Sequence, residues 1–244
     1  MRGIRGRTVL VTGAASGFGA GIASRFAAEG GRVLVADINT EAGEAQAEAI
    51  GARFLEMDVA DEQSVASSLA NLDGPVDILV NNAGIGLLPQ PLAEVSPEDF
   101  ERLLSINVRS IYHTTRALVP DMRARGGGVI LNIASTAGVS PRPGLTWYNA
   151  SKGWVITATR SMAVELAADN IRVNAINPVA GETPLLSTFM GGDTEANRAR
   201  FLSTIPLGRF STPSDIASAA CFLCSDEASM ITGVALEVDG GRCV

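Results

Sequence analysis

Three residues of the chain have the types and spacing of a proton-transfer site. Lys152 follows Tyr148 by four residues, and Ser135 lies thirteen residues before that tyrosine, at the end of an apolar run. Residues four apart share one face of a helix, and residues 147–169 contain few helix breakers, so both side chains are expected over one site. A free tyrosine titrates near ~10 and acts as a base near neutral pH only where its phenolate is stabilised. A nearby lysine ammonium would do so, which indicates phenol chemistry rather than metal, thiol or imidazole chemistry.

The composition limits the class of protein. At 244 residues the chain is long enough to bury a large core, and a single domain over residues 1–244 is expected. Apolar residues make up 46% and charged residues 18%, which is typical of a compact globular protein. The formal net charge of −7 disfavours a nucleic-acid or anionic-membrane surface, since such surfaces need clustered lysines and arginines. A small-molecule partner is therefore favoured.

The sequence indicates a soluble, cytoplasmic protein without a metal centre. The first residues include three arginines but no apolar segment of the signal-peptide type, and no segment reaches the roughly 18 apolar residues of a membrane span. The three cysteines include no second metal-spaced pair, so buried structural thiols are expected. His113 is the only histidine and cannot by itself build a metal site or a catalytic triad.

Short β-branched runs alternate with longer, alanine-rich amphipathic stretches along the chain. This pattern is typical of repeated βαβ units, which predict an α/β fold with a doubly wound, Rossmann-like parallel sheet of seven strands and helices on both faces. The expected strands are 8–11, 32–36, 52–57, 78–80, 129–133, 172–176 and 235–238. The expected helices are 18–29, 40–50, 62–71, 97–125, 147–169, 193–204 and 213–225.

One long region lacks this periodicity. It runs from Pro178 to about Gly192 and contains two prolines and a pair of glycines. Irregular segments of this length in compact domains are often functional lids. We therefore expect a substrate loop region over about residues 178–210.

A glycine-rich segment, residues 12–19, follows the first expected strand and opens the first expected helix. This is the context that a dinucleotide phosphate loop requires. Gly13 would allow the tight turn, Gly17 the close approach of backbone to the pyrophosphate, and Gly19 close helix packing. The helix N-terminus would receive the phosphate charge. The cofactor contacts expected from this segment are Gly13, Ser16, Gly17, Phe18 and Gly19.

Asp37 indicates which dinucleotide binds. It lies just past the second expected strand, eighteen residues after Gly19, where a carboxylate can accept hydrogen bonds from the adenosine ribose hydroxyls. The same carboxylate would repel a ribose 2′-phosphate, and neither its neighbours nor the glycine-rich segment offers a cation. NAD is therefore preferred over NADP. Further cofactor contacts are expected after the third and fourth strands, from Asp58, Val59, Asn82, Ala83 and Gly84.

Together these motifs resemble those of the short-chain dehydrogenase/reductase family in its short, single-domain form. The resemblance covers essentially the whole chain. It rests on the glycine pattern of residues 12–19, the segment 81–84, Asn107, Ser135, the segment 148–152, and Asn177-Pro178 followed by Thr183. In this order and spacing the motifs are highly specific, whereas any one of them alone is common.

The resemblance implies a role for each matching residue. Tyr148 would be the general acid/base that exchanges a proton with the substrate oxygen while hydride moves to or from the nicotinamide. Lys152 would lower the pKa of Tyr148 and hydrogen-bond the nicotinamide ribose, and Ser135 would orient and polarise the substrate oxygen. Asn107 would hold a water that links Lys152 to solvent. Thr183 would anchor the nicotinamide carboxamide.

One departure from the family pattern falls on the expected substrate loop. Many relatives have glycine directly after the Asn-Pro pair, whereas this chain has Val179, with Gly181 two residues later. Thr183 keeps its offset from Asn177, so nicotinamide anchoring is expected to survive, with Val179 as a neighbouring cofactor contact. The departure leaves open the backbone path of the loop and, with it, the wall of the pocket.

The expected substrate pocket is largely apolar and has no basic cluster. The residues expected to line it are Thr136, Ala137, Pro141, Leu145, Ala180, Leu185, Leu186, Phe189 and Met190. We therefore expect an NAD-dependent dehydrogenase or reductase of a small, mostly apolar secondary alcohol or ketone, although Arg142 near the mouth could still bind a carboxylate. Two alternatives stay open: an NADPH-dependent 3-oxoacyl thioester reductase and a dinucleotide-binding regulator without turnover. Family analogy suggests a homotetramer.

Overall fold

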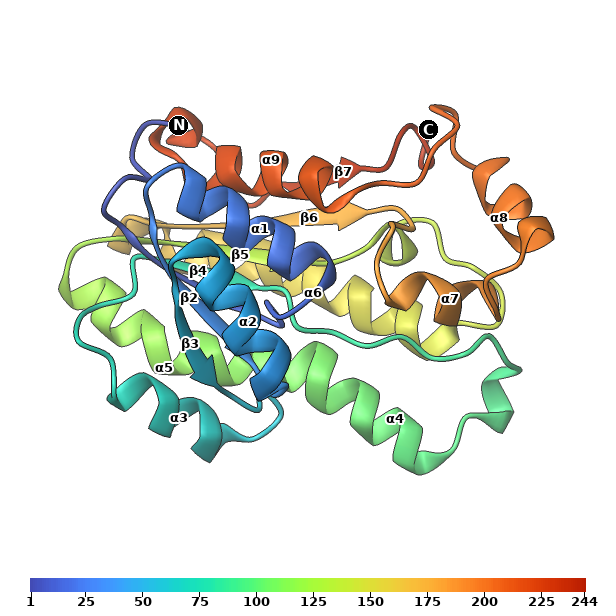
Figure 1. Ribbon diagram of the computed structural model, residues 1–244, viewed down its shortest axis with the longest axis horizontal. Helices are drawn as coiled ribbons and strands as arrows, with labels where there is room; N and C mark the ends of the chain where they lie inside the picture. Colours follow the sequence, from blue (N-terminus) through green and yellow to red (C-terminus); the bar gives the residue numbers. More distant parts are fainter.

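Seven parallel strands form the centre of the computed structural model, which describes residues 1–244 (Figure 1). The strands are β1 (Thr8–Thr12), β2 (Arg32–Asp37), β3 (Arg53–Glu56), β4 (Ile78–Asn81), β5 (Gly128–Ile133), β6 (Ile171–Pro178) and β7 (Ala235–Val238). Their order in the sheet is β3-β2-β1-β4-β5-β6-β7, and every neighbouring pair is parallel. The winding reverses between β1 and β4, and ligands of such sheets bind at this point, beyond the carboxyl ends of the strands.

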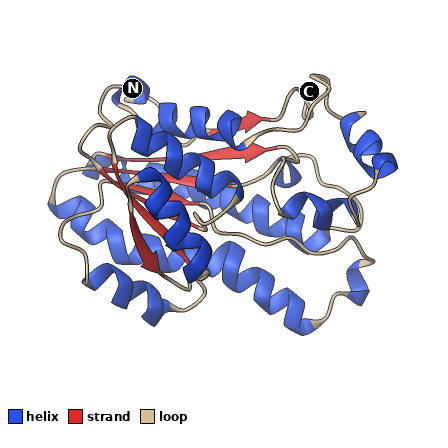
Figure 2. Cartoon of the chain, in the orientation of Figure 1, coloured by secondary structure: helices blue, strands red, loops and turns tan.

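Helices cover both faces of the sheet (Figure 2). They are α1 (Gly17–Ala28), α2 (Thr40–Ile50), α3 (Glu62–Ala70), α4 (Pro97–Leu104), α5 (Ser110–Ala124), α6 (Thr146–Leu166), α7 (Leu185–Met190), α8 (Glu195–Leu202) and α9 (Pro213–Cys224). The expected fold class, a doubly wound seven-stranded sheet, is confirmed. No helix is both long enough and apolar enough to cross a membrane.

The alternation of side chains along β1 divides the core between the two faces. Val9 and Val11 pack with residues of α1 and α9, whereas Leu10 packs with residues of α3, α5 and α6. Successive side chains of a strand point to opposite faces, so a central strand covered on both sides has to be apolar at every position. All five residues of β1 are buried, which explains why its sequence reads as a continuous run rather than an alternating one.

The helix expected over residues 97–125 is not uniform. The backbone stays helical, but residues Ser105–Arg109 form a π-helical turn between α4 and α5. Asn107 lies in this turn, and its side chain accepts a hydrogen bond from the backbone N–H of Ile85 at 2.8 Å and donates to the Ile85 carbonyl at 3.0 Å. Such single π turns are frequent at functional sites and leave no mark in the hydrophobic period.

The region 178–192, expected to be irregular, contains the six-residue helix α7. Leu186 and Met190, one turn apart, are buried with Val179, Phe201 and other residues of α8 and the segment that follows it. This small apolar cluster stabilises a helix too short to show a periodic pattern, which is why the sequence expectation was wrong here.

A buried polar network joins the sheet to α5 and α6. Asn81 and Asn132 are register partners on β4 and β5, and the amide of Asn81 donates to the Asn132 side-chain oxygen at 2.9 Å. The Asn132 amide donates to Thr159 on α6 at 2.9 Å, and Thr114 on α5 donates to Asn81 at 2.7 Å. All four side chains are buried. The network therefore fixes both helices against the strand ends that carry the candidate site.

Replacing Asn132 by Ala is expected to lower the free energy of unfolding by about 2–4 kcal/mol, because it leaves the Asn81 amide without its acceptor and opens a cavity. Urea unfolding followed by circular dichroism measures the change. The control is Asn71→Ala, since the exposed Asn71 amide bonds only to the Ser67 carbonyl. Equal stability of the two variants would contradict the role given to the network.

Candidate active site

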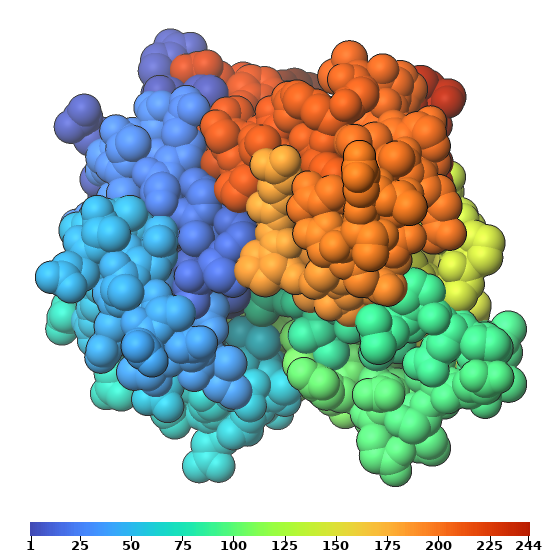
Figure 3. Space-filling model, turned by 45° about the vertical axis from the view of Figure 1, so that its right-hand side comes forward, coloured from blue at the N-terminus to red at the C-terminus, as the bar shows by residue number.

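A cavity of about 720 Å³ lies beyond the carboxyl ends of the strands. It is lined by residues of the β1–α1 turn, the ends of β2, β4 and β5, helix α6 and the segment from β6 to α7. In the space-filling view the surface is hollowed where the N-terminal third, the region around α4 and the α7–α8 region meet (Figure 3). This place coincides with the reversal of strand order between β1 and β4.

The turn after β1 forms one wall of the cavity. Gly13, Ser16, Gly17 and Phe18 line it, whereas Gly19 does not. Gly13 has φ +62°, and a Cβ there would lie 2.8 Å from the Ala83 Cα. A Cβ on Gly19 would lie 2.2 Å from the Gly13 carbonyl oxygen, so Gly19 serves the close packing of α1 against the turn. The turn thus presents backbone, without side-chain bulk, at the N-terminus of α1.

Asp37 closes the far end of the same wall. Its carboxylate accepts hydrogen bonds from the Ala15 N–H at 3.0 Å and the Asn39 N–H at 2.9 Å, and it forms no ion pair. Each carboxylate oxygen accepts one of these bonds and keeps further acceptor capacity, and Asp37 lines the cavity. A ribose diol fits this acceptor, whereas a 2′-phosphate would meet an uncompensated negative charge.

The ends of β3 and β4 supply the next part of the cavity. The lining includes the expected residues Asp58, Val59, Asn82, Ala83 and Gly84. The Asn82 amide donates to the carbonyls of Thr12 and Gly13, at 2.9 and 3.0 Å, and so holds the strand end against the turn. Gly84 leaves a narrow space, since a Cβ there would lie 3.4 Å from the Lys152 Nζ.

Ser135, Tyr148 and Lys152 converge on the inner part of the cavity. Ser135 lies two residues after the end of β5, and its hydroxyl accepts a hydrogen bond from the Ala137 N–H at 3.1 Å. Tyr148 and Lys152 are both buried on α6, and the Nζ of Lys152 lies 5.9 Å from the centre of the Tyr148 ring. Lys152 is the only lysine of the chain, every other basic side chain except His113 being an arginine. Its Nζ donates to the Ile133 carbonyl at 3.0 Å.

Burial is the largest influence on the pKa values of Tyr148 and Lys152. It raises the pKa of Tyr148 to about 12, and a hydrogen bond with Ser135 and the charge of Arg142 oppose that rise. Burial also lowers the pKa of Lys152 to about 8. The net shift of the Tyr148 pKa is a rise, because desolvation of the phenolate outweighs the hydrogen bond with Ser135 and the charge of Arg142. The lowering of this pKa by Lys152 stays a prediction. Near neutral pH Tyr148 is a phenol that can donate its proton.

Asn107 lies behind the cavity and does not line it. Besides its two bonds to the Ile85 backbone, its amide donates to the Ser151 hydroxyl at 3.2 Å. Ser151 is the neighbour of Lys152 on α6. Asn107 thus links the π-helical turn, the strand that ends before Ile85 and the helix that carries the catalytic candidates. The water contact that the resemblance implies for Asn107 stays a prediction.

Thr183 and Val179 line the cavity at the segment between β6 and α7. Val179 is also buried in the apolar cluster around α7, so the departure from the family pattern is accommodated by packing. Of the nine residues expected to line the substrate pocket, Pro141 and Met190 do not. Arg142 does line it, and so do residues that sequence reasoning missed: Arg102, Ser105 and Ile106 at the junction of α4 and the π-helical turn.

Comparisons with known proteins agree with this geometry. A family model described as enoyl-(acyl carrier protein) reductase matches residues 13–242. The chain is 48% identical to 4-formylbenzenesulfonate dehydrogenase of Comamonas testosteroni over 97% of both chains, and 39% identical to cyclopentanol dehydrogenase of the same species over 98% of this chain and 97% of the other. A crystal structure of 3-ketoacyl-(acyl-carrier-protein) reductase from Brucella melitensis complexed with NADH is 50% identical, with a TM-score of 0.94 over 99% of this chain and all of the other.

Proposed function

The chain belongs to the short-chain dehydrogenase/reductase family of oxidoreductases, and from this we propose that it is an NAD-dependent enzyme acting on a small, mostly apolar secondary alcohol or its ketone. The observation that carries the proposal is the convergence of Ser135, Tyr148 and Lys152 on the cavity that also holds the glycine turn and Asp37. Residues 1–244 would act as one catalytic domain, with residues 178–210 forming the substrate side.

The cavity fits a nicotinamide dinucleotide. The glycine turn lines the cavity at the N-terminus of α1, which suits a pyrophosphate, and Gly13 lets this turn pack closely against Ala83. Asp37 would bind the adenosine ribose, and Thr183 would anchor the nicotinamide carboxamide. The strand ends around Val59 and Ala83 would contact the cofactor between these two residues. When bound, the cofactor supplies the hydride acceptor or donor of the reaction.

Tyr148 moves the proton in the proposed mechanism. In the direction of ketone reduction its phenol donates the proton to the substrate oxygen, which is the form favoured by a pKa of about 12. In the direction of alcohol oxidation its oxygen accepts that proton, and the charges of Lys152 and Arg142 stabilise the phenolate. Ser135 donates a hydrogen bond to the same substrate oxygen, where negative charge develops.

The proposed preference for NAD over NADP rests on Asp37. We expect kcat/KM for NAD to exceed that for NADP by about 100-fold or more, since each unpaired charge or lost charged hydrogen bond costs about 1.5–3 kcal/mol. Asp37→Ser should reduce this ratio at least about tenfold while keeping an acceptor for the Ala15 N–H. Steady-state rates with both cofactors measure it, with the exposed Asp73→Ser as the control. A preference for NADP in the wild type would contradict the proposal.

A second candidate is the reduction of 3-oxoacyl thioesters with NADPH. The 50% identical structure, a 3-ketoacyl-(acyl-carrier-protein) reductase, favours this reaction, although that structure contains NADH. The same rate comparison separates the two, when a 3-oxoacyl thioester and cyclopentanol are offered as substrates. A regulator that binds the cofactor but catalyses no reaction would not need the buried Tyr148 and Lys152. The turnover of the Tyr148→Phe variant tests this alternative.

The assembly and location belong to the proposal as well. Tyr112 on α5 and Trp154 on α6 are 54% and 41% exposed, and these apolar surfaces suit the interface of a homotetramer. Light scattering of the purified protein would measure the assembly. The acidic composition argues against nucleic-acid and anionic-membrane partners, and we propose a cytoplasmic location as well.

A further inference from the structure

Arg142 places a positive charge in the wall of the cavity. It lines the same cavity as Ser135 and Tyr148 and is half-buried. Its guanidinium lies 4.3 Å from the centre of the Phe201 ring, and its backbone carbonyl accepts a hydrogen bond from the Asn149 amide at 2.8 Å. The first contact positions the side chain and the second the backbone, and no carboxylate forms an ion pair with the guanidinium.

Two further arginines surround Arg142 and are unpaired as well. Burial is the largest cause that lowers the pKa of Arg142, and the charges of Arg242 and Arg200 lower it further. Arg242 donates to the Ser140 hydroxyl at 3.3 Å, but its buried Nε has no partner. Asp239, the acidic residue nearest to Arg242 along the chain, accepts hydrogen bonds from the backbone N–H groups of Gly241 and Cys243.

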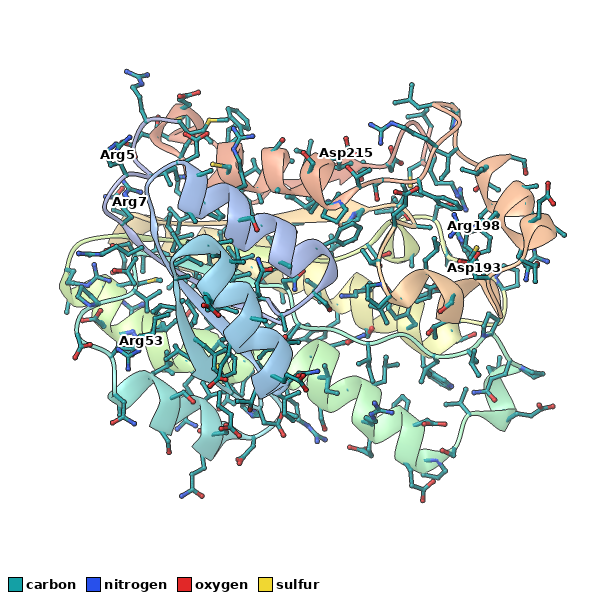
Figure 4. All side chains as sticks on the ribbon, in the orientation of Figure 1. Arg5, Arg7, Arg53, Asp193, Arg198 and Asp215 are labelled. Atoms are coloured by element: carbon teal, nitrogen blue, oxygen red, sulfur yellow. The ribbon has the colours of Figure 1, made fainter.

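Two arginines close to Arg200 in the sequence are paired with carboxylates. Arg198, two residues before Arg200, forms an ion pair with Asp193 through two hydrogen bonds (Figure 4). Arg209 binds Asp215 in the same two-pronged manner. In a chain with 26 acidic and 19 basic residues, Arg142 in the cavity wall and the two unpaired arginines close to it leave a local excess of positive charge that an anion would neutralise.

We propose that the substrate carries a carboxylate or a sulfonate at the end remote from the reacting carbon, and that Arg142 binds this group. Arg200 and Arg242 add positive charge without needing direct contact. The same cavity is lined by apolar residues such as Leu145 and Phe189, which suit the body of the substrate. A guanidinium matches a planar or trigonal oxyanion through two parallel hydrogen bonds. This inference rests on the oxidoreductase function proposed above and names its substrate class.

Matched pairs of alcohols test the proposal. 4-(1-Hydroxyethyl)benzoate and 4-(1-hydroxyethyl)benzenesulfonate are compared with 1-phenylethanol, a secondary alcohol that lacks only the anion. We expect kcat/KM with NAD to be at least about 10-fold higher for one of the anionic alcohols, and the better of the two identifies the anion. The advantage should shrink at high ionic strength, because salt screens the half-buried charge. Equal values for all three alcohols would overturn the inference.

Three variants separate the charge from the packing of Arg142. Arg142→Gln is expected to lower the ratio of kcat/KM for the anionic over the neutral alcohol by about 10- to 100-fold, mainly through KM. Arg142→Lys should restore part of this ratio. Arg160→Gln removes the same charge from an exposed, unpaired position on α6 and should leave the ratio unchanged. If Arg142 only supported Phe201, Arg142→Gln would affect both alcohols alike and the ratio would stay constant.

Binding measured without turnover distinguishes a failure of this inference from a failure of the proposed function. Calorimetry would follow 4-acetylbenzoate and acetophenone as they bind the NAD-saturated protein. Tighter binding of the benzoate that is lost in Arg142→Gln supports the anion site, even if none of the alcohols is oxidised and the proposed reaction fails. Oxidation of 1-phenylethanol together with equal binding of the two ketones would leave the reaction standing and reject the anion site.

Discussion

Replacing Tyr148 by Phe is expected to lower kcat by about 10²- to 10⁴-fold, which is the usual contribution of a positioned general acid or base. Phenylalanine keeps the ring that packs 4.9 Å from Phe189, centre to centre, so the cavity keeps its shape. Only the hydroxyl that exchanges the proton is lost. NAD binding is expected to stay within about twofold, because the contacts proposed for the cofactor come mainly from the turn after β1 and from the strand ends.

The chain contains a matched control for this experiment. Tyr112 is the only other tyrosine, and it is exposed on α5. Tyr112→Phe removes the same atom and should retain wild-type turnover. Formation of NADH from an accepted alcohol measures the rates, and fluorescence titration with NADH measures binding. Turnover of Tyr148→Phe at the wild-type rate would remove the general acid/base from the mechanism, whereas loss of NADH binding would show that the variant damages the cofactor site.

Lys152→Met is expected to abolish most turnover and at the same time to stabilise the protein. Burial lowers the pKa of Lys152 to about 8, so the folded protein holds a desolvated ammonium at neutral pH. One pKa unit corresponds to about 1.4 kcal/mol, which puts the cost of this burial at up to about 3 kcal/mol. Methionine fills a similar volume without a charge, although it leaves the Ile133 carbonyl without its donor. The free energy of unfolding at pH 7 should rise by about 1–3 kcal/mol.

The pH dependence distinguishes this cause from a change in packing. At pH 7 the lysine is protonated in both the folded and the unfolded protein, so its full cost is present. Above a pH of about 8 the folded protein loses this proton while the unfolded chain keeps it up to a pKa of about 10.5, and the wild type gains stability with rising pH. Urea unfolding at pH 7 and pH 9.5 should therefore show the advantage of Lys152→Met shrinking. An advantage that is constant with pH would assign the effect to packing instead.

The elements with strong local signals were predictable from the sequence. The apolar run of β1, followed by the glycines of residues 12–19, identifies a strand and a phosphate turn, because backbone geometry there depends on few residues. Tyr148 and Lys152 were placed over one site by helical spacing alone. Asp37 could be found because a strand end fixes where its side chain lies.

The features that could not be predicted from the sequence depend on contacts between distant segments of the chain. The π-helical turn around Asn107 is stabilised by the backbone of Ile85, and α7 by side chains from the following helix. Arg142, Arg200 and Arg242 come from three parts of the chain, so their cluster exists only in the folded protein. The raised pKa of Tyr148 has the same origin, because spacing along a helix says nothing about how completely a phenol is desolvated.

The single lysine of the chain gives the molecule an unusual chemical simplicity. An amine-acylating reagent has one side-chain target in all 244 residues, which lies inside the cavity beside Gly84, and a second target only at the α-amine of Met1. The arginines of the surface are inert to such reagents. A covalent tag on this nitrogen therefore reports on the occupancy of a single pocket, without any engineering of the remaining surface.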